Sequence, residues 1–330
     1  MKLTRFARFA SLAAGSAALV LSSVALAAAP AAPAGAKKPV MGELPPTGSG
    51  PRMDIVFVID STGSMGGEIE NVKSEVTSMA KEILAGKPTP DVRFGVVDYR
   101  DKGDDFRVRN IELTRDFDAV YKFINSIFAG GGGDGPESVN MGLETAVYKM
   151  AWDKDRNTAK MVFLLGDAPG HEYDGEKGYK EIALRAKKDG ITVNTIACRD
   201  WAEMLTEWKD IAKITGGEFS TLKYKGVAVD TAGKSKTVVT DGSTTYVADE
   251  EISAADWSKD ISTLKAEKKL RAAKAGEFGA AAGVYGGASG SGGAAAAAPA
   301  PSMIARDKSD VGSVMTKAAK KAAMDHGVSY

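Results

Sequence analysis

The chain has 330 residues, 43 of them basic, 43 acidic and two histidine, so its formal net charge at pH 7 is zero. This balance argues against nucleic acid as the main partner, because nucleic-acid binding requires an excess of positive charge on one face. The single cysteine, Cys198, rules out a disulfide bond within the chain, and two histidines are too few for a His-rich zinc or copper site.

Residues 1–27 have the pattern of a secretory signal. Three basic residues come first, an apolar stretch covers 12–24, and an Ala-Leu-Ala cleavage site ends the segment. The apolar stretch is shorter than a membrane span requires, so we expect cleavage, no stable membrane span afterwards, and a periplasmic or secreted bacterial protein. An uncleaved N-terminal anchor is the alternative. Residues 28–51, rich in Ala, Pro and Gly, are a predicted linker.

Strand and helix patterns alternate over residues 52–222, which predicts an α/β fold with a doubly wound, mainly parallel sheet flanked by helices. The first strand contains five consecutive apolar residues, 55–59, as expected for a strand covered on both faces. The later strands are predicted at 92–97, at 107–113 on an antiparallel edge, at 161–165 and at 191–198. Helices are predicted at about 69–83, 116–127, 136–150 and 176–188, and from about 205 to a stop at Gly216.

The pattern changes after Leu222. Residues 223–275 are predicted to form a small β-hairpin and helix extension. Residues 276–302 are almost all Gly, Ala, Ser and Pro, too poor in large apolar side chains to repay ordering, so we expect a disordered tether. Residues 303–330 have the spacing of a short amphipathic helix. On this division, the α/β domain is expected to stay folded without the chain from Gly276 onward.

Three oxygen-bearing side chains stand at alternate positions where the first strand ends: Asp60, Thr62 and Ser64. Hard divalent cations prefer such oxygen ligands. Asp167 follows the other strongly apolar strand, and the carboxyl ends of parallel strands meet at one edge of a sheet, where α/β proteins bind ligands. We therefore expect a cation site at that edge. The alternative for residues 60–64 is a helix-capping turn, since Asp, Ser and Thr are common cap residues.

The Asp-x-Thr-x-Ser pattern of residues 60–64 resembles the metal-ion-dependent adhesion site of von Willebrand factor type A domains, doubly wound α/β modules that bind protein ligands through Mg²⁺. The segments 134–137 (Asp-Gly-Pro-Glu) and 166–168 (Gly-Asp-Ala) look like those in the A-type domains of integrin β polypeptides. The resemblance covers residues 52–222. It implies that Glu137 reaches the cation and that Asp134 helps to form a neighbouring cation site.

The middle loop departs from the family pattern, because many A domains contribute a threonine there and this chain has none between Phe128 and Leu143. A carboxylate from Asp134 or Glu137 in that role would attract a cation more strongly and leave it less electrophilic towards an acidic partner. The alternative for these two residues is an acidic first helical turn that complements the helix dipole. The acidic cluster between Asp98 and Asp105 is either a second cation site or a solvated turn.

We predict a non-enzymatic, exported adhesion or scaffold module, in which Mg²⁺, or Mn²⁺ or Ca²⁺, bridges to an acidic side chain of a protein partner. The alternatives are a metal-assisted envelope hydrolase and a cation-stabilised structural module whose partner docks elsewhere. His171 and Ser64 would serve a hydrolase, but no Gly-x-Ser-x-Gly elbow surrounds Ser64. The predicted ligands are Asp60, Thr62, Ser64, Glu137, Asp134 and Asp167.

Overall fold

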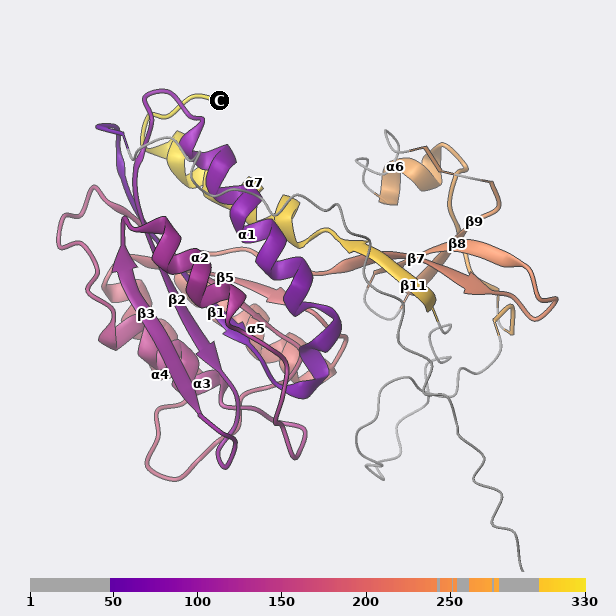
Figure 1. Cartoon of the computed structure of the whole chain (residues 1–330), viewed down its shortest axis with the longest axis horizontal. Helices are drawn as coiled ribbons and strands as arrows, with labels where there is room; N and C mark the ends of the chain where they lie inside the picture. The colour runs from indigo at the N-terminus through magenta and orange to yellow at the C-terminus, as the bar shows by residue number, and fades with distance from the viewer. Residues whose placement is uncertain (1–47, 242–243, 251, 254–260, 275, 279–302) are drawn as a thin grey trace, which may run out of the picture. The chain divides into compact units, whose positions relative to one another are not determined.

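The computed structural model describes residues 48–241, 244–250, 252–253, 261–274, 276–278 and 303–330. The predicted signal peptide and most of both predicted linkers lie outside these ranges. A six-stranded sheet has the order β3-β2-β1-β4-β5-β6, and only β3 runs antiparallel to its neighbour (Figure 1). Its strands are β1 (Arg52–Asp60), β2 (Asp91–Tyr99), β3 (Val108–Thr114), β4 (Ala159–Gly166), β5 (Ile191–Ala197) and β6 (Phe219–Thr221).

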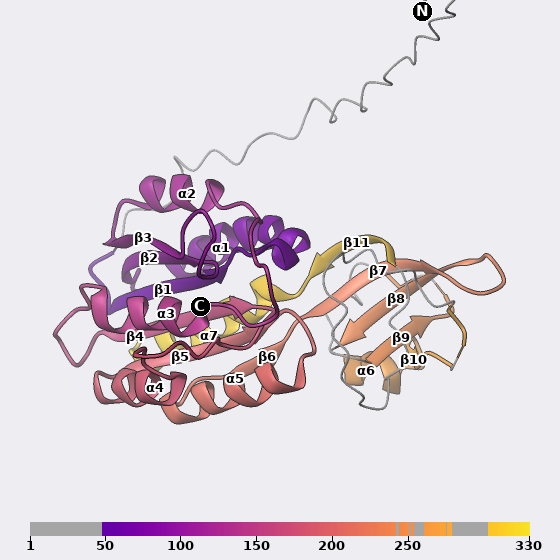
Figure 2. The same cartoon turned by 90° about the horizontal axis from the view of Figure 1, so that it is seen from below.

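Helices cover both faces of this sheet (Figure 2). One apolar cluster contains residues of α1 (Ile69–Leu84), α2 (Phe117–Asn125) and α7 (Val311–Asp325). The other contains residues of α3 (Val139–Glu144), α4 (Tyr179–Lys188) and α5 (Ala202–Thr215). Successive side chains of a strand point to opposite faces, and in β1 Phe57 joins the first cluster while Val56 and Val58 join the second. The predicted doubly wound α/β fold is confirmed.

Local signals explain where some helices begin and end. The Asp116 carboxylate accepts the Ala119 N–H and caps α2. α5 ends at Gly216, which adopts a left-handed conformation with φ of 77°. The helix predicted at 136–150 is divided, because α3 passes into a π-helical turn, η3 (Thr145–Lys149). A short 3₁₀ turn, η2 (Gly63–Gly67), precedes α1.

The strand order reverses at β1, whose two neighbours are β2 on one side and β4 on the other. Such a reversal opens a crevice at the carboxyl ends of the two strands, since their connections leave in opposite directions. Ile59 is paired with Leu165 in the β1–β4 register, so Asp60 and Gly166 end neighbouring strands. The topology therefore places Asp60 and Asp167 beside one crevice.

Residues after β6 form a second, antiparallel sheet of order β10-β9-β8-β7-β11, larger than the hairpin expected from the sequence. The difference arises because β11 comes from the C-terminal segment and pairs with β7. Such pairing between distant segments leaves no local pattern. The elements are β7 (Lys223–Val229), β8 (Ser235–Asp241), β9 (Thr244–Ala248), α6 (Ile261–Ala266), β10 (Arg271–Ala272) and β11 (Met303–Ser309).

Helix α7 packs beside α1 and completes one face of the first sheet (Figure 1). Val311, Met315 and Ala319 are fully buried there. The C-terminal Tyr330 hydroxyl donates to the Ile83 carbonyl at the end of α1. Removal of the chain from Gly276 onward is thus expected to uncover the core, contrary to the expectation from sequence. Helical spacing revealed the apolar face of this segment but not the surface that it covers. Within the described part of the chain, no helix is both long and apolar enough to cross a membrane.

Met315→Ala is expected to lower the free energy of unfolding by about 2–5 kcal/mol, because it leaves a cavity between α7 and the sheet. Lys317→Ala, at an exposed position of the same helix, is expected to change it by less than about 0.5 kcal/mol. Denaturant unfolding of both variants measures the difference. Equal midpoints for the two variants would show that α7 does not share the core of the domain.

Candidate metal centre

A chain of hydrogen bonds links the ends of β1 and β4. The Asp60 Oδ1 atom accepts from the Thr62 N–H (2.8 Å) and from Thr62 Oγ1 (2.7 Å). Ser64 Oγ donates to Asp167 Oδ1 at 2.8 Å. The two hydroxyl oxygens are 3.2 Å apart. Four of the six predicted ligands, Asp60, Thr62, Ser64 and Asp167, therefore lie together.

The hydroxyl groups of Thr62 and Ser64 lie between two carboxyl groups. Each hydroxyl is within hydrogen-bond distance of one carboxyl group and of the other hydroxyl, and in the 3.2 Å contact between them either oxygen can be the donor. Two hydroxyl oxygens and the carboxyl oxygens of Asp60 and Asp167 therefore lie close together. Hard divalent cations prefer oxygen ligands of these kinds.

Glu137 lies next to the Asp60 turn. A Cβ at Gly132 would be 2.8 Å from Glu137 Oε1 and 3.2 Å from Thr62 Cβ, so both side chains border that glycine. Two backbone hydrogen bonds anchor Glu137 to the loop after β4: its N–H donates to the Pro169 carbonyl (3.0 Å), and its carbonyl accepts the His171 N–H (2.7 Å). Glu137 is thus held at the cluster by backbone geometry.

Asp134 takes no part in this cluster. Its side chain is 60% exposed, and its Oδ2 lies 3.7 Å from His171 Nε2. The two acids of the predicted Asp-Gly-Pro-Glu segment therefore differ in position, with Glu137 buried and Asp134 on the surface.

The acidic cluster at the end of β2 makes structural contacts with donors of the protein itself, although Asp98 Oδ1 has no partner among the described residues. Asp98 pairs with Arg109 at 2.6 Å. Asp101 accepts from the hydroxyls of Ser138 and Tyr173, both at 2.7 Å. Asp104 accepts the N–H groups of Asp101 and Gly132. These contacts tie the loops around the candidate site together.

Arg100, which lies within the acidic cluster at 98–105, is a buried positioning residue, a role that its sequence context did not indicate. Its side chain is 1% exposed, yet it carries a charged guanidinium between the rings of Phe106 and Phe128, 4.5 and 4.6 Å from the ring centres. The guanidinium donates to Ser61 Oγ and to the Phe128 carbonyl. Arg100 thereby joins the Asp60 turn to the glycine-rich loop. The available signal was an arginine directly after a buried strand.

Burial raises the pKa of all three buried acids, and acidic neighbours add to the shift for Asp60 and Glu137. Burial raises the pKa of Asp60 above its ordinary value, and the charge of Asp167 raises it further. Burial also raises the pKa of Asp167, partly opposed by the Ser64 hydrogen bond and the charge of Arg199. Burial, followed by the charge of Asp60, raises the pKa of Glu137 from 4.5 to about 9. A proton or a cation would relieve this repulsion.

The donor set fits a hard cation that keeps part of its water. Asp60 Oδ2 and Glu137 Oε2 are buried and have no hydrogen-bond partner among the described residues. Mg²⁺ is commonly held by one or two carboxylates with several waters. Across the described ranges, no three or more His, Cys, Asp or Glu side chains form a metal-holding group. A cation here would therefore depend on the hydroxyls of Thr62 and Ser64 as well as on carboxylates.

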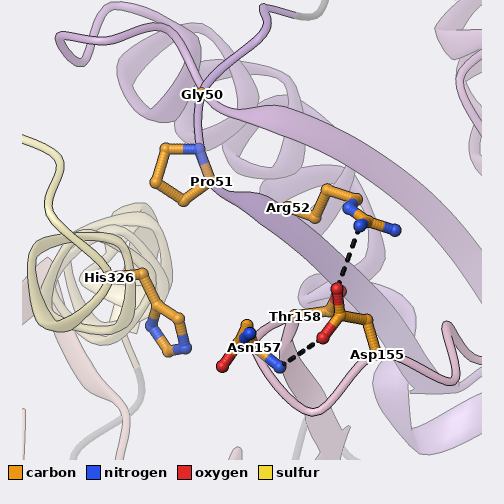
Figure 3. Close-up of a pocket in the computed structure, with 7 residues that line it drawn as sticks. All are labelled: Gly50, Pro51, Arg52, Asp155, Asn157, Thr158 and His326. Carbon is orange, nitrogen blue, oxygen red and sulfur yellow. Dashed lines mark hydrogen bonds and ion pairs between the residues drawn. The ribbon is translucent and has the colours of Figure 1, made fainter.

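A cavity of about 280 Å³ lies at the other end of the strands, beside the starts of β1 and β4 (Figure 3). Arg52 Nη2 lies 3.0 Å from Asp155 Oδ2 across it, and Arg52 also pairs with Asp153. The His326 Nδ1 atom is within hydrogen-bond distance of the Ala322 carbonyl. Because these charges neutralise one another, the cavity offers weaker ligand chemistry than the crevice at Asp60.

A family model described as the von Willebrand factor type A domain matches residues 54–224, just over half of the chain. The chain belongs to this family. Von Willebrand factor A (VWA) domains generally serve in protein–protein interaction or adhesion, and no comparison points to an enzymatic activity of this chain.

Relatives with similar sequences match about a third of this chain. The chain is 32% identical over 120 residues to alpha-protein kinase vwkA of Dictyostelium discoideum, which is 36% of this chain and 19% of that protein. It is 33% identical over 97 residues to von Willebrand factor A domain-containing protein 7 of Homo sapiens, covering 29% of this chain and 10% of that protein. The chain thus spans less than a fifth of the length of either relative.

Solved structures with a similar fold include the SpRpn10 VWA domain, with a TM-score of 0.41 and 13% identity over 52% of this chain and 87% of that one. Proximal thread matrix protein 1 from the mussel byssus has a TM-score of 0.41 and 18% identity, over 53% of this chain and 42% of that one.

Proposed function

We propose that this VWA domain binds a divalent cation, Mg²⁺ or else Mn²⁺ or Ca²⁺, at the carboxyl ends of β1 and β4, and uses it as a bridge to a carboxylate of a protein partner. The observation that carries the proposal is the convergence of the Thr62 and Ser64 hydroxyl oxygens, 3.2 Å apart, with the carboxyl oxygens of Asp60 and Asp167 that they contact. The unpartnered oxygens of Asp60 and Glu137 support it. A buried acceptor without a donor costs about 1–3 kcal/mol, which a cation would recover.

Asp60, Thr62, Ser64, Glu137 and Asp167 would hold the cation. The bound ion supplies a positive centre with a coordination position that a partner carboxylate fills. Ser64 is exposed, so the cluster opens to solvent on that side. Glu137, in place of a threonine, adds negative charge, which favours the cation and weakens its pull on an acidic partner. Asp134 would serve a neighbouring cation, as in integrin β-like A domains. Export to the periplasm or beyond belongs to the same proposal and rests on residues 1–27.

The contacts of Ser64 and His171 give no support to a hydrolase. Ser64 Oγ donates to Asp167. His171 stacks on Tyr173 at 4.0 Å between ring centres and turns Nε2 towards Asp134. A serine nucleophile requires a base within hydrogen-bond reach, and these two side chains have other partners.

Mg²⁺ is expected to raise the thermal stability of the purified chain, because a ligand that binds only the folded state adds about 2.7 kcal/mol at 100 times its Kd. The double variant Asp60→Asn, Asp167→Asn should lose this gain. Without metal it should be at least as stable as the wild type, since the repulsion between the two acids is gone. Asp105→Asn, 86% exposed at the same edge, is the control. An unchanged Mg²⁺ effect in the double variant would remove the proposed site.

Water-proton relaxation with Mn²⁺ tests the bridge itself. A cation with an open position keeps an exchangeable water, so Mn²⁺ bound to the chain should enhance relaxation, and an excess of a peptide with one aspartate should reduce the enhancement. The matched peptide with asparagine should have no effect. A Mn²⁺ complex without exchangeable water would indicate a closed, structural site.

Glu137→Gln is expected to weaken Mg²⁺ binding about 10-fold with little change in stability, because a hard cation distinguishes a carboxylate from an amide of the same shape. Asp134→Asn, a few residues away and exposed, is expected to leave the Mg²⁺ affinity within about twofold and to affect any neighbouring Ca²⁺ site instead. Calorimetric titration measures both. Equal Mg²⁺ affinities for Glu137→Gln and the wild type would return Glu137 to a helix-dipole role.

A further inference from the structure

Helix α5 places a buried carboxyl group behind the loop that anchors Glu137. The Glu207 side chain is on average only 8% exposed. Its Oε2 atom accepts the Gly170 N–H at 2.9 Å. Its Oε1 atom has no hydrogen-bond partner in the described part of the chain. One oxygen of a carboxyl group is thus engaged while the other is buried without a donor.

A second unpartnered oxygen lies at the same glycine. Asn140 of α3 is 4% exposed, and its Nδ2 donates to the His171 carbonyl at 3.3 Å. Its Oδ1 has no donor among the described residues. A Cβ at Gly170 would be 2.6 Å from Glu207 Oε1 and 3.1 Å from Asn140 Oδ1. Two acceptors from two helices therefore border one side of Gly170.

Turning the Asn140 amide over would not satisfy both of its contacts. Nδ2 would then face Glu207, but Oδ1 would face the His171 carbonyl, which is also an acceptor. In the observed orientation, a proton on the Glu207 carboxyl group would supply a donor between the two acceptors. We propose that Glu207 is a positioning residue for the loop that holds Glu137, an inference that rests on the proposed cation site. Glu207 acts in its protonated form, in which Oε1 donates to Asn140 Oδ1 directly or through one water molecule.

The backbone connects this contact to the candidate cation site. Gly170 and Glu137 form an isolated β-bridge. In this bridge the Glu137 N–H donates to the Pro169 carbonyl, and the His171 N–H donates to the Glu137 carbonyl. Glu207 holds Gly170 from the other side. It therefore affects the Glu137 carboxylate through the loop, because its own hydrogen bond goes to Gly170.

The surroundings of Glu207 favour the proton. Burial, together with the charges of Glu203 and Glu172, raises its pKa from 4.5 to about 7 against the opposing hydrogen bond from the Gly170 N–H. A raised pKa in the folded state means that the stability contribution is complete below about pH 4.5 and is lost as the pH rises through about 7. The other titratable groups on the neighbouring elements have partners of their own: Tyr179 with Asp210, Lys177 with Glu144, and His171 with Tyr173 and Asp134.

The test compares the wild type with Glu207→Gln and Glu207→Ala from about pH 5 to about pH 9. Glutamine accepts the Gly170 N–H and donates permanently to Asn140, so it imitates the protonated acid at every pH. Glu203→Gln, on the same helix and exposed, controls for the removal of one charge. Unfolding without metal and Mg²⁺ titration are measured for each protein, and titration of the cation ligands cancels in the ratio of two variants.

We expect the stability of the wild type relative to Glu207→Gln to fall as the pH rises from about 5 to about 7 and to stay level above that. The Mg²⁺ affinity of the wild type should match that of Glu207→Gln below pH 7 and be about 10-fold lower above it. Glu207→Ala should bind Mg²⁺ weakly at every pH, and Glu203→Gln should follow the wild type with the fall displaced to lower pH, since the charge of Glu203 raises the pKa of Glu207. The infrared carbonyl band of a protonated carboxylic acid should be present in the wild type at pH 6 and diminished in Glu207→Gln.

Three outcomes would overturn parts of the proposal. Parallel stability curves for the wild type and Glu207→Gln would show that Glu207 does not hold the proton. If the stability of the wild type and of Glu207→Gln diverges with pH while the ratio of their Mg²⁺ affinities stays constant, Glu207 stabilises the fold without affecting the cation site. If neither the wild type nor any variant binds Mg²⁺, the proposed function and the link from Glu207 to Glu137 both fail. The stability curves measured without metal would still show whether Glu207 holds a proton.

Discussion

The burial of three carboxyl groups is the constraint on which the edge of the main sheet depends. Asp60, Glu137 and Asp167 are nearly inaccessible, and burial raises the pKa of each. The charge of Asp167 adds to the shift of Asp60, and the charge of Asp60 adds to that of Glu137. The hydrogen bonds from Thr62 and Ser64 hold two of them, and backbone bonds to the loop after β4 hold the third. A proton or a cation at this edge would offset the cost of burying charged carboxylates. The proposed cation site agrees with these electrostatics.

The doubly wound topology creates this edge. Because the strand order reverses at β1, the carboxyl ends of β1 and β4 border the crevice that such a reversal opens. Gly166 permits the close approach of the two strand ends, since a Cβ there would lie 3.0 Å from the Asp60 Cβ. The loops around the crevice are joined by Arg100, whose buried guanidinium lies between two aromatic rings.

Two layers of support lie behind the candidate ligands. The first is the network of Asp101, Asp104 and Ser138, which connects the end of β2 to the loop of Glu137. The second is Glu207, which holds Gly170 from α5. In a VWA domain that recognises a partner through a cation, such supports determine how firmly the ligands hold their geometry. A shared proton at Glu207 would make that firmness depend on pH near neutrality.

The amino-acid sequence by itself determined the α/β class, the family resemblance, and the placement of Asp60 and Asp167 at one edge, because strand burial and strand ends leave local patterns. The tertiary structure alone decided that Glu137 joins the cluster while Asp134 remains exposed, that α7 completes the core, and that β11 pairs with β7. It also revealed Arg100 and Glu207 as supports. These features depend on contacts between segments far apart in the chain, and packing rather than local periodicity sets such contacts.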